Sequence, residues 1–153
     1  MLPTTVDRVP HNTYESVNEA IRRRTRLSVV HHAAEGEAAI ERRLAELDSE
    51  WDIERTLEAN AAGASLFGFA MGTFVDKRYY LLPLAAAGFL LEHSLLGWCP
   101  PLSFYRWMGV RTAEEIEEER YALKFLRGDF REVGVVSEHA AERAELALDA
   151  VRK

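Results

Sequence analysis

The sequence contains a single cysteine, Cys99, so it excludes an internal disulfide and allows a reducing compartment. It also lacks an excess of positive charge. Its net charge of −6 argues against a nucleic-acid partner, because a nucleic-acid-binding surface would be basic. The first 20 residues show neither a basic segment nor an apolar run behind it, so no secretory signal is expected.

Motifs for catalysis and metal binding are missing as well. The sequence has no Gly-rich phosphate loop and no HExxH, CxxC, GxSxG or paired-cysteine zinc pattern. His31 and His32 are neighbours in an expected helix, and adjacent positions point in different directions, which is a poor spacing for one metal ion. We therefore expect that the protein is not an enzyme and that it binds no metal and no cofactor.

Strand signals are scarce and the apolar spacing is helical, which predicts an all-α fold. A first helix is expected to start at Asn12, with Glu15 as its capping partner, and Gly36 is expected to end it. A second helix carries an amphipathic stripe formed by Ile40, Leu44, Leu47 and Trp51. The stripe then changes phase, which predicts a kink or a new cap within residues 49–52.

Charged residues are strongly segregated along the chain. The 17 residues from Ala59 to Val75 carry no charge, and from Tyr79 to Tyr105 the only formal charge is Glu92. Seventeen helical residues span about 26 Å, close to the roughly 30 Å of a bilayer core. We therefore expect an apolar helical hairpin, with its lead-in helix and exit loop, over residues 51–108. Charged amphipathic helical arms, expected in the cytoplasm, flank it: residues 1–50 before it and residues 109–153 after it.

Small residues favour a transmembrane hairpin over a soluble one. Ala64, Gly68 and Gly72 recur at four-residue spacing, which lets helix backbones approach closely in lipid. A glycine inside a soluble helix costs about 1 kcal/mol relative to alanine. Aromatic residues also cluster at both ends of the hairpin, as they do at membrane interfaces. Antiparallel pairing about Lys77 places Gly68 opposite Ala86.

Polar residues gather near one end of the apolar slab. In the same register Glu92 and His93 lie level with the residues that follow Asn60. Asn60 is therefore the expected partner of this polar pair. Ionisable groups cost less at the edge of a membrane than at its midplane, because water and headgroups reach them there.

The stretch "GWCPP" places the only thiol beside this pair. In one continuous helix His93 and Cys99 would lie about 9 Å apart along the axis, and Glu92 about two turns from Cys99. The helix dipole also disfavours a thiolate at a helix C-terminus. Pro100 and Pro101 are expected to stop the helix and force an extended exit. The favoured interpretation is an interfacial helix stop, while a redox, persulfide or metal role for Cys99 stays open.

The C-terminal arm has a clear helix start. Thr112 is the expected N-cap, and Glu115 occupies the third helical position of a capping box. Residues 127–136 are expected to form a loop, and Ser137 to begin a short last helix. The apolar face of that helix would consist of Ala141, Ala144, Leu148 and Val151.

Three segments within residues 50–131 resemble an uncharacterised bacterial family with a YgaP-like transmembrane domain: "EWDIERTLEANAA", "GFLLEHSLLGWCPP" and "GVRTAEEIEEERYALKFLRGDF". In some relatives this two-helix domain follows a rhodanese sulfurtransferase domain at the inner membrane. The resemblance implies a membrane hairpin, a possible homodimer and a loose association with sulfur metabolism. It implies no activity, because the rhodanese active-site cysteine has no counterpart here.

The expected function is that of a structural or interaction module in the bacterial cytoplasmic (inner) membrane. Both termini would be cytoplasmic, and only the Asp76–Arg78 turn would cross. The expected partners are the lipid bilayer, a second copy of the chain or an unidentified protein. One alternative is a thiol or persulfide carrier, or a redox sensor, that uses Cys99 with Glu92 and His93. A second alternative is a soluble regulatory helical bundle.

Overall fold

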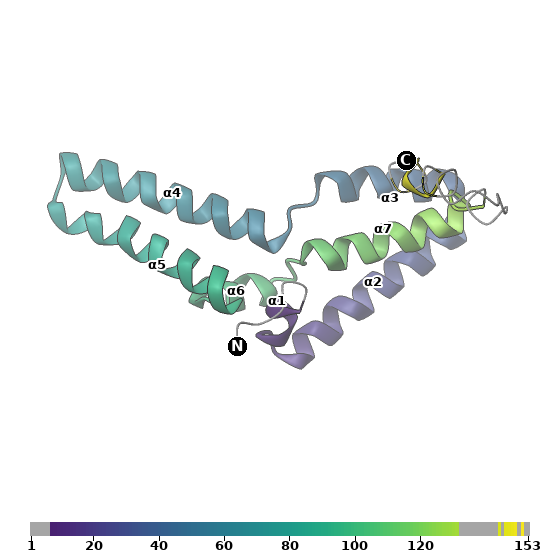
Figure 1. Ribbon diagram of the computed structural model, residues 1–153, viewed down its shortest axis with the longest axis horizontal. Helices are drawn as coiled ribbons and strands as arrows, with labels where there is room; N and C mark the ends of the chain where they lie inside the picture. The colour runs from purple at the N-terminus through teal and green to yellow at the C-terminus, as the bar shows by residue number, and fades with distance from the viewer. Residues whose placement is uncertain (1–6, 132–143, 145, 150, 152–153) are drawn as a thin grey trace. The chain divides into compact units, whose positions relative to one another are not determined.

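The computed structural model describes residues 7–131, 144, 146–149 and 151 (Figure 1). These residues form helices and turns and contain no strand, which confirms the all-α class. The expected helix start at Ser137 lies outside them. The elements are α1 (Arg8–His11), α2 (Glu15–Glu35), α3 (Glu37–Ser49), α4 (Ile53–Phe74), the 3-10 helix η1 (Lys77–Tyr80), α5 (Leu81–Leu96), α6 (Pro100–Trp107) and α7 (Ala113–Arg127).

The chain folds into two compact units, each built from two separate stretches of sequence. The first unit combines residues 1–23 with 51–116, and the second combines residues 24–50 with 117–153. The sequence pattern, by contrast, divides the chain into three consecutive parts. Helices α2 and α7 each contribute residues to both units.

The helix boundaries in the first half follow the local sequence signals with one exception. Gly36, at a φ of +94°, separates α2 from α3 as expected. The predicted break within residues 49–52 is confirmed, since Asp52 caps α4 by accepting a hydrogen bond from the Arg55 backbone N–H at 2.7 Å. The start predicted at Asn12 is wrong. The Asn12 amide instead donates to the carbonyl oxygens of Arg8 (2.7 Å) and Leu96 (3.0 Å), because this residue closes α1.

Helices α4 and α5 lie side by side and antiparallel, joined through η1 (Figure 1). Gly68 and Gly72 are the points of close approach. A Cβ atom on Gly68 would lie 2.6 Å from Leu82 Cβ, and one on Gly72 would lie 2.7 Å from the Tyr80 ring. The expected pairing of Gly68 with Ala86 is therefore wrong. The turn lies earlier in the chain than Lys77, because α4 already ends at Phe74 and η1 leads directly into α5.

The two prolines after Cys99 begin a helix instead of forcing an extended exit. Pro100 and Pro101 are the first two residues of α6. The first turn of a helix tolerates proline, because the missing N–H would have no intrahelical acceptor there. The capping box of α7 is confirmed. The Thr112 N–H donates to Glu115 Oε2 at 2.8 Å, and the Glu115 N–H donates to Thr112 Oγ1 at 3.2 Å.

A buried arginine, Arg106, connects several segments of the first unit through hydrogen bonds. The guanidinium of Arg106, which is fully buried, donates to both carboxylate oxygens of Glu115 at 2.6 and 2.8 Å. It also donates to Asn18 Oδ1 (3.0 Å), the Val110 carbonyl (3.0 Å) and Thr13 Oγ1 (3.2 Å). The apolar core beside it consists of Val9, Ile53, Leu57, Cys99 and Leu102. This core fixes where α5 ends and α6 begins.

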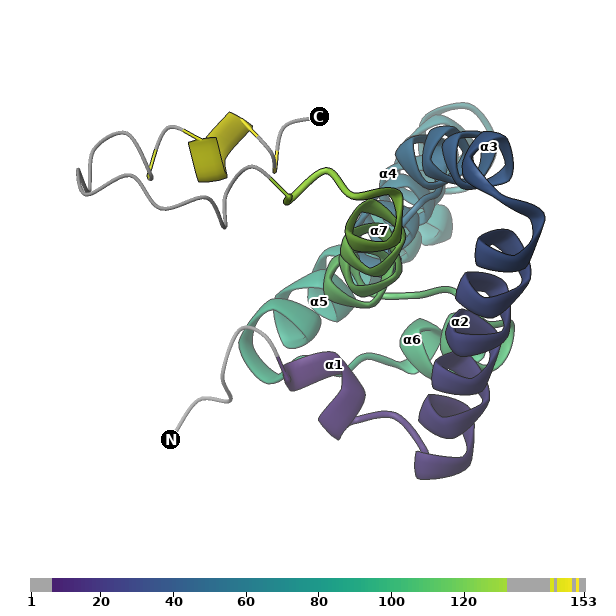
Figure 2. The ribbon, with the colours of Figure 1, turned by 90° about the vertical axis from the view of Figure 1, so that its right-hand side faces the viewer.

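The second unit has its own buried charge, contributed by α7. The carboxylate of Glu119 accepts hydrogen bonds from Arg43 Nε at 2.8 Å, from Arg43 Nη2 at 3.1 Å and from Ser28 Oγ. These contacts join residues of α2, α3 and α7 (Figure 2). The Glu119 contacts raise the pKa of Arg43 further above its ordinary value. The buried apolar residues of this unit are Ala39, Ile40, Leu44, Leu47 and Leu123.

Candidate functional site

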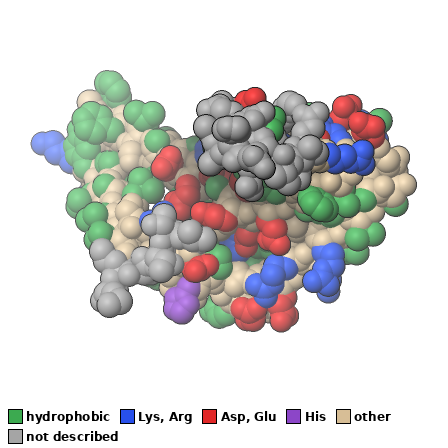
Figure 3. Space-filling view, turned by 45° about the vertical axis from the view of Figure 1, so that its right-hand side comes forward, with side chains coloured by type: hydrophobic (Ala, Val, Ile, Leu, Met, Phe, Trp, Pro, Cys, Tyr) green, Lys and Arg blue, Asp and Glu red, His purple; other side chains and the backbone are tan. Residues whose placement is uncertain are grey.

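The hairpin exposes much of its apolar surface. Figure 3 shows hydrophobic side chains gathered over one end of the molecule, with basic side chains at the tip. The exposed large side chains of α4 and α5 are Leu66, Phe67, Phe69, Phe74, Leu81, Leu82, Leu84, Phe89, Leu91, Leu95 and Leu96. Within the described part of the chain one helical segment, Lys77–Leu96, is long and apolar enough to cross a bilayer, and only 11% of it is buried.

Cys99 is placed by a tight helix stop at Gly97. Gly97 has a φ of +73° and donates its N–H to the His93 carbonyl at 2.8 Å, which ends α5. This left-handed stop is the usual way in which glycine reverses a chain after a helix. Cys99 consequently becomes the residue that precedes α6, with only 2% of its surface exposed. The 9 Å separation from His93, which assumed one continuous helix, is therefore wrong.

The imidazole of His93 is the centre of the buried polar cluster. Its Nε2 lies 2.7 Å from Glu54 Oε2, and the ring interacts electrostatically with Cys99. The partner expected from the sequence, Asn60, is not part of this cluster. The exposed Asn60 amide donates to the Thr56 carbonyl at 2.7 Å on its own helix.

Glu92 lies beside His93 in the sequence but does not join the cluster. Its side chain is half-buried. The ionisable group that α4 brings to His93 is Glu54, 39 residues away in the sequence. The register predicted from the sequence could not identify Glu54, because the observed register of α4 and α5 differs from it. Glu54 also lies before the uncharged run of residues 59–75 that defined the predicted hairpin.

Arg8 of α1 fixes the far side of Glu54. Its Nη2 lies 3.0 Å from Glu54 Oε1, and its Nη1 donates to the Ser94 carbonyl at 3.2 Å. The hydrogen bond from His93 and the Arg8 contact lower the pKa of Glu54, against the opposing effect of burial. Glu54 is therefore a carboxylate at neutral pH and a constant acceptor for His93 Nε2–H.

This contact decides which nitrogen of a neutral His93 carries the proton. Nε2 faces a carboxylate, so it carries the hydrogen, and Nδ1 keeps its lone pair. Nδ1 is buried and has no hydrogen-bond partner within the residues that the structure describes.

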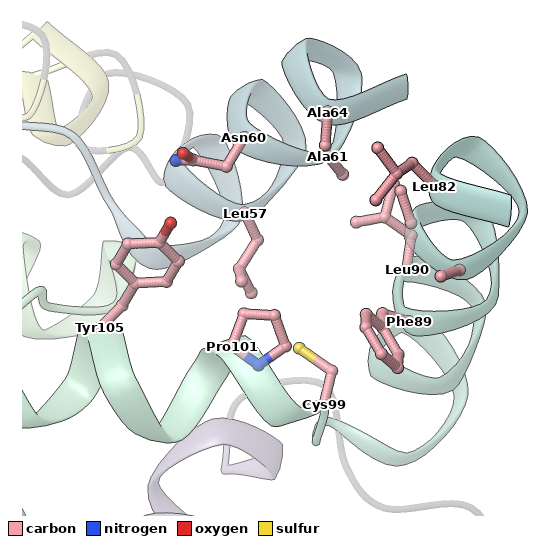
Figure 4. Close-up of a pocket in the computed structure, with 12 residues that line it drawn as sticks. Leu57, Asn60, Ala61, Ala64, Leu82, Phe89, Leu90, Cys99, Pro101 and Tyr105 are labelled. Atoms are coloured by element: carbon pink, nitrogen blue, oxygen red, sulfur yellow. The ribbon is translucent and has the colours of Figure 1, made fainter. Parts of the chain in front are cut away.

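A cavity of about 350 Å³ opens beside the thiol, between α4, α5 and α6 (Figure 4). Figure 4 shows Cys99 and Pro101 at one wall, with Asn60 and Tyr105 on one side and Leu82 on the other. Apolar side chains dominate the rest of the lining: Leu57, Ala61, Ala64, Ala85, Ala86, Phe89 and Leu90. This volume falls within the usual range of small-molecule sites.

Gly68 and Gly72 pack against α5 and η1, whereas Ala64 lines the cavity and stays exposed.

Among the described residues no group of three or more His, Cys, Asp or Glu side chains is placed to hold a metal ion. No protein-family model, no curated protein and no solved structure matches this chain.

Proposed function

We propose that this chain is a membrane-embedded helical hairpin protein, with α4 and α5 inserted in the bilayer and the other helices outside it. The observation that carries the proposal is the exposure of long apolar side chains along both helices. Monomeric soluble proteins rarely expose contiguous apolar surface of this kind, so it marks a membrane or protein interface.

Composition at the two ends of the hairpin supports insertion in lipid. Lys77 and Arg78 form the basic tip, next to Tyr79 and Tyr80. Trp98 lies at the opposite end of α5. Aromatic and basic side chains are enriched at membrane interfaces, where one part of each side chain stays in contact with water or headgroups.

The orientation follows from the same pattern. Both charged arms leave the hairpin at its open end, so both lie on one side of the membrane, in the cytoplasm. The module would hold a second copy of itself or another protein at the inner membrane. The sequence resemblance to the YgaP-like transmembrane family supports this interpretation. It also keeps a link with sulfur metabolism as a hypothesis.

Fractionation of cells that express the chain tests the insertion. The wild-type chain is expected in the membrane pellet, resistant to carbonate washing and extracted by detergent. Phe67→Glu and Leu84→Glu each put a charge on an exposed face of the hairpin. Each should shift protein to the soluble or degraded fraction, because a charge at the centre of a membrane helix costs about 2.5–3.5 kcal/mol.

Ala45→Glu in α3 is the matched control, because it adds the same charge at an exposed position outside the hairpin. It should leave the distribution unchanged. Recovery of folded wild-type protein in the soluble fraction without detergent would refute insertion and favour the soluble regulatory bundle.

Labelling from outside the cell tests the orientation. In a Cys99→Ser background, a cysteine introduced by Lys77→Cys at the tip should react with a membrane-impermeant maleimide in intact cells. A cysteine introduced by Glu41→Cys in α3 should react only after the cells are broken. The reverse pattern would show that the arms are exported.

The second candidate function is thiol chemistry at Cys99. It is favoured by the electrostatic interaction of Cys99 with His93 and by the hydrogen bond between His93 and Glu54. The sequence interpretation paired the thiol with Glu92 and His93. The geometry replaces Glu92 with Glu54.

A further inference from the structure

We propose that the cavity between α4, α5 and α6 binds one acyl chain of a membrane phospholipid, with the ester carbonyl of that chain held at Asn60 and Tyr105. The inference rests on the proposed membrane insertion, because the ligand comes from the surrounding bilayer. It goes further than insertion, since it assigns a defined site for a single lipid molecule to the surface of the hairpin. All the residues that line the cavity belong to the first compact unit.

Small side chains create the cavity. Gly68 lies so close to α5 that a Cβ atom there would be 2.6 Å from Leu82 Cβ, so the two helices touch at this level. Nearer the open end of the hairpin, alanine lines both walls: Ala61 and Ala64 on α4, and Ala85 and Ala86 on α5. Because alanine carries a single methyl group, these positions leave between the helices a space that larger side chains would fill.

The cavity has a closed inner side and an open outer side. Leu57 and Cys99, which line it, belong to the buried core, and Tyr105 packs against that core. Leu82 and Phe89 also line it, and each is 39% exposed. These two side chains are part of the apolar surface that would contact lipid. A chain from the bilayer therefore enters the cavity without crossing a polar surface of the protein.

The lining selects an uncharged and mainly apolar ligand. Within the described part of the chain no charged side chain lines the cavity, and leucine, alanine, phenylalanine and proline form most of its wall. A charged ligand would lose its hydration there without gaining a partner. Lipid tails are as apolar as such a wall, so a preference for one chain must come from packing and from hydrogen bonds at a polar end.

Asn60 and Tyr105 provide that polar end. Figure 4 shows their polar groups on one side of the cavity and Leu82 on the other. The Asn60 amide donates one hydrogen to the Thr56 carbonyl at 2.7 Å and has a second to give. The Tyr105 hydroxyl forms no hydrogen bond with another described residue, so it can donate as well. Two donors at one end of an apolar cavity suit a carbonyl oxygen, the acceptor in the ester of a phospholipid.

The direction and length of the cavity match one leaflet of a bilayer. Asn60 is the second residue of the uncharged run of residues 59–75, and Gly68, level with Leu82, lies next to its middle. The eight steps from Asn60 to Gly68 span about 12 Å, against about 15 Å for half of a bilayer core. The site therefore runs from the edge of the membrane to near its centre. An acyl chain of the leaflet at the open end runs the same way, with its carbonyl at the edge.

The size of the cavity argues against a helix of a second copy as its occupant. A helix with its side chains is about 10–12 Å wide, so a 12 Å length of it fills about 900 Å³ or more. The cavity measures about 350 Å³. A hydrocarbon chain is much narrower than a helix, and a second copy could place no more than a side chain there.

Photocross-linking of the full-length chain in vesicles tests the site. The vesicles consist of phosphatidylethanolamine and phosphatidylglycerol with a trace of a phosphatidylcholine that carries a mid-chain diazirine, and mass spectrometry maps the cross-linked residues. Ala61, Ala64 and Ala85 should be labelled more than Ala62 and Ala87, which are exposed on the same helices outside the cavity. The expected excess is about tenfold, the preference that two hydrogen bonds and packing would give.

Variants test each end of the site. Ala64→Phe fills the apolar part and should lower labelling at Ala61 and Ala85 to the level of the exposed positions. Ala62→Phe, at nearly the same depth but outside the cavity, is the matched control and should change nothing. Tyr105→Phe removes one donor and keeps the ring, so it should lower cavity labelling about fivefold. Circular dichroism of each variant in the vesicles separates a lost site from a lost fold.

The possible failures point to different conclusions. Equal labelling of cavity and exposed positions in an inserted chain would overturn the lipid site and leave the membrane hairpin intact. Folded wild-type chain that stays outside the vesicles would refute both. Cavity labelling by a diazirine-bearing free fatty acid, but not by the phospholipid, would overturn the phospholipid as ligand. A disulfide between two copies of Ala85→Cys, made in a Cys99→Ser background, would assign the cavity to a second copy instead.

Discussion

His93 Nε2 and Glu54 Oε2 lie 2.7 Å apart and join α5 to α4 at the open end of the hairpin. Neither residue belongs to a recognisable motif. Together they orient an imidazole against the only thiol of the chain. The same contact stabilises the open end of the hairpin and would take part in the thiol chemistry proposed for Cys99.

The Glu54 contact predicts a specific pH dependence of stability. The pKa of Glu54 is lowered in the folded state, chiefly by its hydrogen bond with His93. A carboxyl group of this kind stabilises the fold above its unfolded-state pKa, and the stabilisation is lost as the pH falls through the lower folded-state pKa. We expect Glu54→Gln to reduce the free energy of unfolding by about 1–2 kcal/mol at pH 7.

Denaturant unfolding, followed by far-ultraviolet circular dichroism at a series of pH values, measures this effect. The difference between wild type and Glu54→Gln should shrink between about pH 5 and pH 3. Glu58→Gln, an exposed change on the same helix, serves as the control and should have little effect at any pH. A difference for Glu54→Gln that stays constant into acid would contradict the assignment.

The turn at Gly97 predicts a large cost for any side chain there. Gly97→Ala would force a φ of +73° on alanine and place its Cβ 2.6 Å from Arg8 Cβ. A non-glycine residue in this conformation costs of order 1–3 kcal/mol, to which the collision adds. Because Gly97 positions Cys99, the thiol should also become more reactive towards N-ethylmaleimide in water.

Gly88→Ala is the matched control for Gly97. Gly88 lies within α5, the helix that Gly97 ends, and has open space where a Cβ would stand. Its replacement should stabilise the chain slightly, by up to about 1 kcal/mol, through the better helix propensity of alanine. Thermal unfolding should thus move in opposite directions in the two variants, and a shared direction would argue against this description of the turn.

The close approach of the hairpin helices predicts different effects for two glycines of α4. Gly68→Ala would bring a methyl group to within 2.6 Å of Leu82 Cβ and Pro83 Cδ. Overpacking of this kind costs about 1–3 kcal/mol. Gly63 has no atom near its Cβ position, so Gly63→Ala should be neutral or mildly stabilising. Equal effects on melting temperature in detergent would contradict the observed register.

The buried Arg106 predicts an order of severity among substitutions at the start of α7. Glu115→Ala removes the partner of both Arg106 Nη atoms and leaves a buried charge, which costs about 3–5 kcal/mol. Thr112→Ala removes a helix cap and should cost about 1 kcal/mol. Glu114→Ala, at an exposed position, should cost little. Urea unfolding of the three variants measures the order, and a Thr112 cost above that of Glu115 would refute it.

Local signals in the sequence predicted much of the secondary structure. The capping box of Thr112 and Glu115, the helix break at Gly36 and the new cap at Asp52 depend on neighbours within four residues. Interactions over such short distances are formed by the backbone and one or two side chains, so the sequence states them directly.

Predictions failed where a turn changed the direction of the chain. Gly97 could have been interpreted as a left-handed helix stop, and Pro100 as a first helical residue, but an unbroken helix through Trp98 was expected. That single assumption placed the His93 ring 9 Å from Cys99. The pairing of Gly68 failed for a similar reason, since the length of the connection sets the register of two helices.

The sequence by itself determined that the chain is helical, that its apolar residues are concentrated in one hairpin, and that it has only one thiol. Only the tertiary structure decided which groups meet that thiol. Glu54, His93 and Cys99 come from three separate elements, and Arg8 comes from a fourth. No local pattern encodes such a meeting, because it depends on helix register and on a reversal at one glycine.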